Sequence, residues 1–316
     1  MTRFQKLTVL CLFLPASGVA TAQFDLCLLN SQTFTPTGAL DEFIVPPNTN
    51  NIRIVAIGAP GGTNFFGDPG GDGAHFEANF AVVPGETLRV GVGGQGGHAV
   101  LTGGGGGGGA SFVARLAPSL EPLVIAGGGG GCGMVPSNPN NYDASLTNAA
   151  FDGAAVSLPL SPGGAAGING NGGAAGSGID GGGAGGAGWL GNGTGVPAAQ
   201  ALSGTAAGGA GGRPGGFGGG GGGNGGGGGG GGYNGGGGAG ADFSDPIQSA
   251  SGGGGGAYLQ PGATFVVAQL AITPVSRVSI CWGQRSVIEV PTLAPLSTVL
   301  LAVLVLAAGV WQIRRG

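Results

Sequence analysis

The stretch 103–131, GGGGGGGASFVARLAPSLEPLVIAGGGGG, places two short apolar segments between two runs of glycine. Residues 112–116 and 123–126 have the length and composition of strands. Apart from the two termini, no stretch of the chain combines helical periodicity with helix caps. The stretch therefore predicts strands that are bounded by glycine.

Residues on both sides of this stretch continue the strand pattern. Phe76, Ala78, Phe80 and Val82 alternate with more polar positions, so one face of a strand is apolar. Val83-Pro84-Gly85-Glu86 predicts a type II turn, with proline second and glycine where φ is positive. Further strands are expected at 52–57, and a final pair at 264–272 and 275–282. Several short strands with Gly/Pro turns predict a mainly β fold, a β-sandwich.

The composition excludes several classes of protein. Glycine makes up 81 of 316 residues, only 8% of residues are charged, and Lys6 is the only lysine. Nucleic-acid binding needs a cluster of cations, and a P-loop needs a lysine within its motif. Glycine does not recur at every third position, which excludes collagen. A hydrophobic content of 41% and a net charge of -4 argue against a disordered polyelectrolyte.

The first 22 residues have the three parts of a secretory signal peptide. Arg3 and Lys6 form the positive start, residues 7–14 the apolar core, and Ala20-Thr21-Ala22 the cleavage site before Gln23. We therefore expect signal peptidase to recognise Ala20 and Ala22 and to cleave before Gln23, and the mature chain to be exported.

Residues 296–313 form a continuous apolar stretch that is long enough to cross a bilayer. Arg314 and Arg315 follow it, and the positive-inside rule keeps them in the cytoplasm. The stretch predicts one C-terminal transmembrane helix, with the body of the protein on the outer side of the inner membrane.

Val290-Pro291-Thr292-Leu293 precedes this helix, and residues 289–316 together resemble the IPTL-CTERM sorting signal of Gram-negative bacteria. Val290 departs from the usual Ile of that signal, and Leu296-Ser297 from its usual Trp-Gly pair. The resemblance implies a transient membrane anchor, processing by an exosortase-type enzyme, and a destination at the cell surface or beyond.

The glycine-rich block 163–256 allows two interpretations. A flexible linker is one, because glycine loses the most backbone entropy on folding. The other is a bundle of polyproline-II helices, which have three residues per turn and pair their backbone groups with neighbouring helices. Turn-like insertions break the glycine runs, and strands lie on both sides of the block. These two features favour the bundle.

Several motifs resemble the glycine-rich ectodomain region of the anaplastic lymphoma kinase and leukocyte tyrosine kinase receptors and their bacterial relatives. They are Phe43-Ile44-Val45-Pro46, Gly58-Ala59-Pro60-Gly61-Gly62, the segment 83–96, and the two glycine runs with the strands beside them. The resemblance covers residues 40–260. It implies a TNF-like β-sandwich, here 23–288, with an inserted bundle of glycine helices, here 133–256. Signalling is not carried over, because this chain has no kinase domain and no EGF-like cysteine module, and cytokine binding is not, because none of the receptors' ligand-contacting residues can be matched.

Few residues suggest chemistry. His75 and His98 have no partner at metal-ligand spacing. The acidic turn 68–73 lacks a full calcium-ligand set, and Arg213 alone does not make an RNA site. Trp189, Phe217 and Tyr233 are expected to pack at the edges of the bundle. We therefore expect no catalytic, cofactor-binding or metal-binding residue, and no cofactor.

Three cysteines remain after removal of the signal peptide, and export permits disulfides. Cys27 precedes the first strand and Cys281 lies on the last, so we favour a Cys27–Cys281 disulfide with Cys132 left over. The alternative is three buried thiols, because sequence cannot determine connectivity.

Two classes of function stay open. The first is a structural or adhesive cell-surface protein without catalysis, and it is the one we favour. The second is a surface module that binds a glycan or a protein, with extracellular polysaccharide as a candidate partner. An ice- or mineral-binding bundle is weaker, since the block has only Thr194 and Thr205. An enzyme is the least expected, because no nucleophile, base and acid set is visible.

Overall fold

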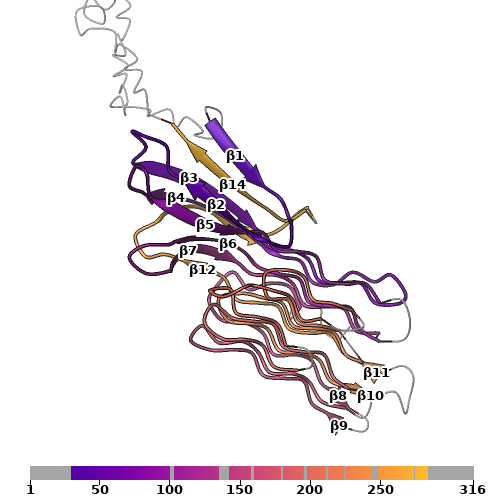
Figure 1. Ribbon diagram of the computed structural model, residues 1–316. Helices are drawn as coiled ribbons and strands as arrows, with labels where there is room; N and C mark the ends of the chain where they lie inside the picture. The colour runs from indigo at the N-terminus through magenta and orange to yellow at the C-terminus, as the bar shows by residue number, and fades with distance from the viewer. Residues whose placement is uncertain are drawn as a thin grey trace, which may run out of the picture.

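The computed structural model describes residues 30–99, 103–134, 142–157, 160–178, 181–195, 198–210, 213–223, 225–242, 248–273 and 275–283. Within these ranges the regular secondary structure is all β, and every strand pair is antiparallel. Two five-stranded sheets lie at one end of the molecule, and glycine-rich segments extend from them (Figure 1). The expected β class is confirmed for this part of the chain.

The first sheet has the strand order β1-β14-β3-β4-β13. Its strands are β1 (Asn30–Phe34), β14 (Arg277–Trp282), β3 (Asn51–Ile57), β4 (Ala74–Ala81) and β13 (Thr264–Leu270). The two chain ends of the sandwich therefore lie side by side, with Ser31 opposite Cys281. The expected final pair, β13 and β14, are not neighbours, because β3 and β4 lie between them.

The second sheet has the order β12-β7-β6-β5-β2. Its strands are β12 (Tyr258–Leu259), β7 (Glu121–Ala126), β6 (Ser111–Arg115), β5 (Thr87–Gly91) and β2 (Leu40–Ile44). The predicted strands at 112–116 and 123–126 are β6 and β7 within about two residues. The turn before β5 has the predicted geometry: Gly85 has φ +83°, and Glu86 N–H donates to Val83 O at 3.0 Å.

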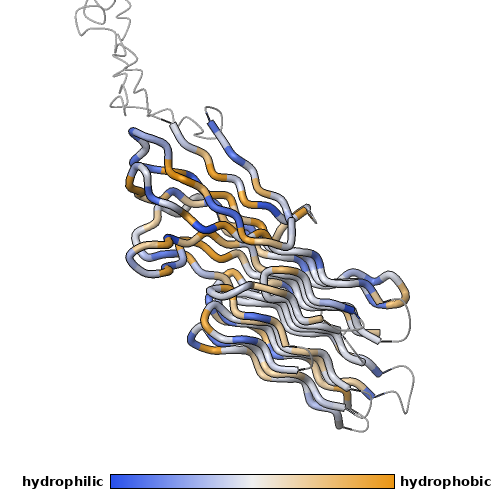
Figure 2. Tube along the Cα trace, viewed as in Figure 1, coloured by the Kyte–Doolittle hydropathy of each residue, from blue (hydrophilic) through white to orange (hydrophobic). Residues whose placement is uncertain are grey.

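The main hydrophobic core lies between the two sheets. Phe76, Ala78 and Phe80 on β4 are buried, as the alternation predicts, and across the core β4 faces β7, which contributes the buried Leu123 and Val124. Figure 2 shows that the hydrophobic positions concentrate in the sheets, whereas the glycine-rich segments are pale. Apolar burial therefore stabilises the sandwich, and the glycine-rich part needs another source of order.

That source is hydrogen bonding between neighbouring glycine-rich segments. We call this set of segments the glycine array. The array includes segments that connect sandwich strands, such as 58–62, 93–97 and 104–109, as well as the described parts of the expected insert. In the segment 105–110, successive N–H groups donate to three different neighbouring segments in turn. Gly105 and Gly108 donate to segment 129–132, Gly106 and Gly109 to segment 94–97, and Gly107 and Ala110 to segment 218–221, at N···O distances of 2.7–2.9 Å.

The same period of three recurs in residues 227–233, which donate in turn to segments 250–256, 105–108 and 184–187. Residues 105–110 and 227–233 therefore each donate to three neighbouring segments, and these N–H groups are satisfied without hydrogen bonds inside the segment. Glycine is required at such positions: a Cβ on Gly107 would overlap the carbonyl oxygen of Gly229, and one on Gly228 that of Gly221. Side chains larger than hydrogen would separate the segments.

Two short hairpins lie at the end of the array that is far from the sandwich (Figure 1). They are β8 (Val156–Ser157) with β9 (Leu160–Ser161), and β10 (Ala241–Asp242) with β11 (Gln248–Ser249). No helix long and apolar enough to cross a membrane is found among the residues that the structure describes. The predicted transmembrane helix 296–313 lies outside them.

Candidate binding surface

A second, smaller core joins the glycine array to the outer face of the second sheet. Phe112 on β6 meets Trp189 of the array edge-on, with ring centroids 5.7 Å apart, and Tyr258 on β12 stacks on Tyr233 at 4.9 Å. Leu202 is fully buried in the same cluster, and Phe217 is partly buried against it. Trp189, Phe217 and Tyr233 pack at the edge of the array, as expected. The sequence did not predict that Phe112 and Tyr258 of the second sheet are the partners of Trp189 and Tyr233.

The array turns next to this core expose aliphatic side chains. Three turns, 145–148, 168–171 and 189–192, carry Leu146, Ile168 and Leu190, whose exposed fractions are 39%, 68% and 64%. We call these three turns the turn surface. None of its residues is charged. An exposed apolar cluster of this kind is typical of a site that contacts another molecule.

Hydrogen bonds hold the three turns side by side. Asn234 is buried, accepts from Gly170 N–H at 2.7 Å, and donates to Asn148 O at 2.6 Å. Leu190 N–H donates to Gly170 O at 2.8 Å. The aliphatic side chains are therefore presented by backbone of fixed position, which lowers the entropy lost on binding.

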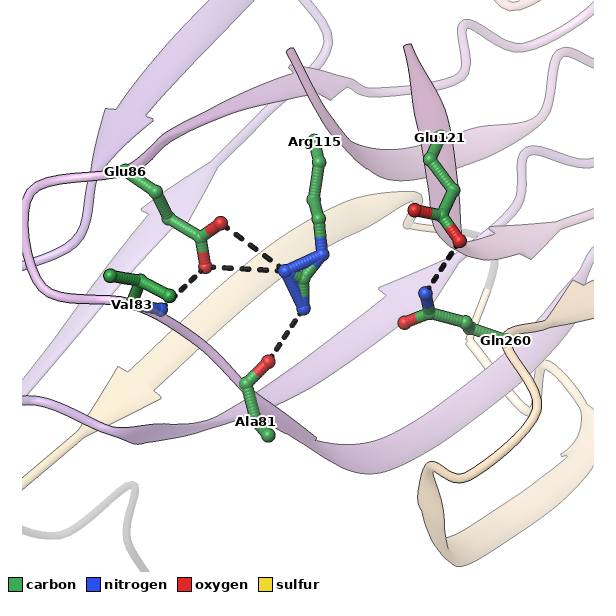
Figure 3. A network of polar contacts seen from close by, with 6 residues as sticks. All are labelled: Ala81, Val83, Glu86, Arg115, Glu121 and Gln260. Atoms are coloured by element: carbon green, nitrogen blue, oxygen red, sulfur yellow. Dashed lines mark hydrogen bonds and ion pairs between the residues drawn. The ribbon is translucent and has the colours of Figure 1, made fainter. Parts of the chain in front are cut away.

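A polar network links the turn 83–86 with the C-terminal ends of β4 and β6 (Figure 3). Arg115 forms an ion pair with Glu86 at 3.2 Å and donates to Ala81 O at 2.6 Å, while Glu86 Oε1 accepts from Val83 N–H. Gln260 donates to Glu121 at 2.8 Å nearby. Arg115 and Glu86 are therefore paired with each other and with backbone groups, and the network holds the turn 83–86 in place.

The two histidines have different partners. His98 Nδ1 accepts from Thr63 N–H at 3.2 Å, which places the proton of the neutral ring on Nε2. His75 lies on β4, and burial lowers the pKa of its imidazole. No group of three or more His, Cys, Asp or Glu side chains that could hold a metal ion occurs in the described part of the chain.

The acidic turn 68–73 is organised by its own protein contacts. Asn64 is buried; its side chain accepts from Asp68 N–H and donates to the Asp68 carboxylate at 2.8 Å. Asp143 accepts from Asp72 N–H at 2.7 Å. Burial raises the pKa of both Asp72 and Asp143, and the charge of Asp143 raises that of Asp72 further.

The cysteines differ in state. Cys281 is disulfide-bonded, and Cys132 is a free, buried thiol whose pKa is raised by burial. Cys27 lies outside the described residues, so the Cys27–Cys281 pairing stays a prediction. The sorting residues Val290, Pro291, Thr292, Leu293, Arg314 and Arg315 and the cleavage residues Ala20, Ala22 and Gln23 lie outside them as well.

The turn surface is the one candidate site that the sequence analysis missed. Its signal was present: Ile168 precedes Asn169 and Gly170, and Leu190 precedes Gly191 and Asn192, in a block where large aliphatic residues are few. No protein-family model matches the chain, and no curated protein matches it significantly.

Proposed function

We propose that this chain is an exported bacterial cell-surface protein with a structural or adhesive role and without catalysis. Signal peptidase removes residues 1–22, the helix 296–313 anchors the body at the inner membrane, and an exosortase-type enzyme processes the tail. In finer terms we propose a TNF-like β-sandwich that carries a bundle of polyproline-II-type glycine helices. The three-residue period of the hydrogen bonds supports the bundle, since that helix has three residues per turn.

One observation carries the adhesive role: the rigid array presents the uncharged, aliphatic turn surface to solvent. A protein that must hold a contact outside the cell gains from a surface whose backbone is already ordered. Glycine segments supply this order without a large apolar core, because their hydrogen bonds form between segments.

Adhesion is tested with cells that display the full chain and its Ile168→Ser/Leu190→Ser variant on their surface. Loss of attachment to abiotic beads or to neighbouring cells in the variant supports the proposal. Ile272→Ser is the matched control, because Ile272 is exposed but lies in the loop between β13 and β14. Equal attachment by all three proteins would refute adhesion through the turn surface.

Export and sorting have a separate test. Mass spectrometry of the surface form should find Gln23 at the N-terminus and no peptide beyond Leu293. Replacing Pro291 and Thr292 should hold the protein in the inner membrane. A surface form that still contains Trp311 would instead make it an ordinary membrane-anchored protein.

A module that binds a glycan or a protein is the second candidate. The stacked pair of Tyr233 and Tyr258, half-buried and close to the turn 145–148 through Asn234, favours it. Aromatic rings with a polar end are common at binding surfaces. An array of glycans and proteins probed with the purified chain, and with Tyr233→Ala as the variant, tests this candidate.

A further inference from the structure

The sandwich has two different ends. Glycine-rich segments follow Ile57 of β3 and Ala126 of β7, so the array leaves the sandwich at that end (Figure 1). β14 runs towards the other end, because its last residue, Trp282, is opposite Ile52 near the start of β3. Four loops connect strands there, and we call this the loop end. The loops are 45–50, 82–86, 116–120 and 260–263.

The loops of the loop end share an apolar composition. Each of them contains proline, and Glu86 is the only charged residue among them. Glu86 is paired with Arg115 at 3.2 Å. Val83 is 64% exposed, and Ile44, directly before the first loop, is 66% exposed. Further exposed residues that extend this apolar surface are Pro47, Pro84, Ala117, Pro118 and Pro261.

Backbone hydrogen bonds join the loops into one surface. Gly85 N–H donates to Val45 O at 2.9 Å and connects the first two loops. Leu116 N–H donates to Thr87 O at 3.3 Å and connects the third loop to the residue after the second. The apolar side chains of the loop end are therefore held side by side before any partner is present, which lowers the entropy lost on contact.

We propose that the loop end contacts the lipid bilayer while the helix 296–313 holds the chain, an inference that rests on the anchor in the proposed function. The chain leaves the sandwich at this end, through Trp282. Only residues 283–295 separate Trp282 from the helix, and they reach at most about 45 Å when fully extended. So short a tether keeps the loop end at a high effective concentration next to the bilayer. The glycine array then extends away from the membrane.

The chemistry of the loop end fits the boundary between lipid headgroups and acyl chains. Apolar side chains enter this boundary, and proline brings no backbone N–H that would lose its water there. Trp282 is partly buried against Phe43, with ring centroids 5.3 Å apart, and tryptophan is typical of membrane interfaces. Because the four loops contain no lysine or arginine, the contact should not depend on anionic lipids.

Lipid photolabelling of the full chain tests the proposal. The chain is reconstituted in phosphatidylcholine vesicles that contain a lipid with a diazirine on its acyl chain, and labelled peptides are mapped by mass spectrometry after irradiation. Label should appear in 296–313 and also in 82–86 and 116–120. Label in 296–313 alone would overturn the proposal and leave the anchor intact. Absence of label from 296–313 would refute the anchor and the proposal together.

Phe65 and Phe66 are the control for orientation. Their exposed fractions, 52% and 66%, are similar to those of Val83 and Ile44. They lie at the tip of the segment 58–73, which leaves the first sheet on the side of the array. They should therefore carry no label. Labelling equal to that of Val83 would show that the vesicles contact exposed apolar side chains anywhere on the protein, and would overturn the proposal.

Two matched variants test which side chains make the contact. Ile44→Ser/Val83→Ser should lose most of the label in 116–120, a loop whose own sequence is unchanged. Phe65→Ser/Phe66→Ser should keep that label. All four replaced side chains are exposed, so neither variant should lose its fold, and the label in 296–313 is the internal standard. Unchanged labelling of 116–120 in Ile44→Ser/Val83→Ser would overturn the proposal.

Discussion

Trp189 packs edge-on against Phe112, with the two ring planes at 81° to each other, although 76 residues separate them in the chain. Trp189 belongs to a turn of the glycine array, and Phe112 to β6 at the middle of the second sheet. Both side chains are almost fully buried. This contact fastens the array to the sandwich at a point where the array itself has little apolar surface.

Replacing Trp189 with alanine should therefore destabilise the whole protein. Removal of a buried Trp typically costs about 3–5 kcal/mol of unfolding free energy. Denaturant unfolding monitored by circular dichroism should show the loss. The neighbouring Leu190→Ala is the control, since Leu190 is exposed and its removal should change the unfolding free energy by less than about 0.5 kcal/mol. Equal effects of the two changes would contradict the packing role.

Glycines inside the array should tolerate a Cβ in proportion to the space around them. A Cβ on Gly228 would overlap the backbone of Gly221, whereas one on Gly222 would meet its nearest atoms, the carbonyl oxygens of Ala210 and Gly209, at 3.3 Å. Gly228→Ala should cost about 1–3 kcal/mol, Gly228→Val more, and Gly222→Ala clearly less.

Hydrogen exchange is the direct measurement for this series. Amides of residues 227–232 should be protected in the wild type, because each donates to a neighbouring segment, and should exchange faster in Gly228→Val. Exchange at the rate of a free peptide in the wild type would mean that the array is not ordered in solution.

The sequence predicts the sandwich strands well, because alternation in stretches such as 76–82 encodes which face is buried. It does not predict that β3 and β4 lie between β13 and β14, since strand order depends on long-range pairing that local patterns do not record. The partners of the glycine segments were unpredictable for a related reason: glycine has no side chain that could encode a register. Trp189 shows the same limit, because its burial could be expected and its partner could not.

The disulfide of Cys281 should be formed with Cys27. Cys132 is buried and free, which leaves it unavailable to either cysteine. Closing so long a loop stabilises the folded state by up to about 5 kcal/mol in the chain-entropy model. Peptide mapping without reduction should recover Cys27 joined to Cys281, and reduction should lower the unfolding midpoint. A peptide that joins Cys132 to either cysteine would disprove the pairing.

Acid should destabilise the sandwich through His75. Its Nε2 is buried and has no hydrogen-bond partner in the described part of the chain, and Nδ1 lies 3.4 Å from Gln269 Nε2 of β13. Burial lowers the pKa of His75 below 6.5; Glu77 opposes this shift, and Arg277 of β14 adds to it. The unfolded chain therefore binds the proton more readily than the folded protein.

The contribution of neutral His75 to the unfolding free energy is complete above pH 6.5, the pKa in the unfolded chain. It is lost as the pH falls through 6.5 towards the lower pKa of His75 in the folded state. The unfolding free energy of the wild type should fall over this range. His75→Gln keeps a polar side chain at the same place on β4 but cannot titrate, so the difference between the two proteins isolates the histidine from Asp72 and Asp143, whose raised pKa values act in the opposite direction. Denaturant titrations at several pH values measure the unfolding free energy of both proteins. If the two plots of unfolding free energy against pH are parallel, His75 does not cause this pH dependence.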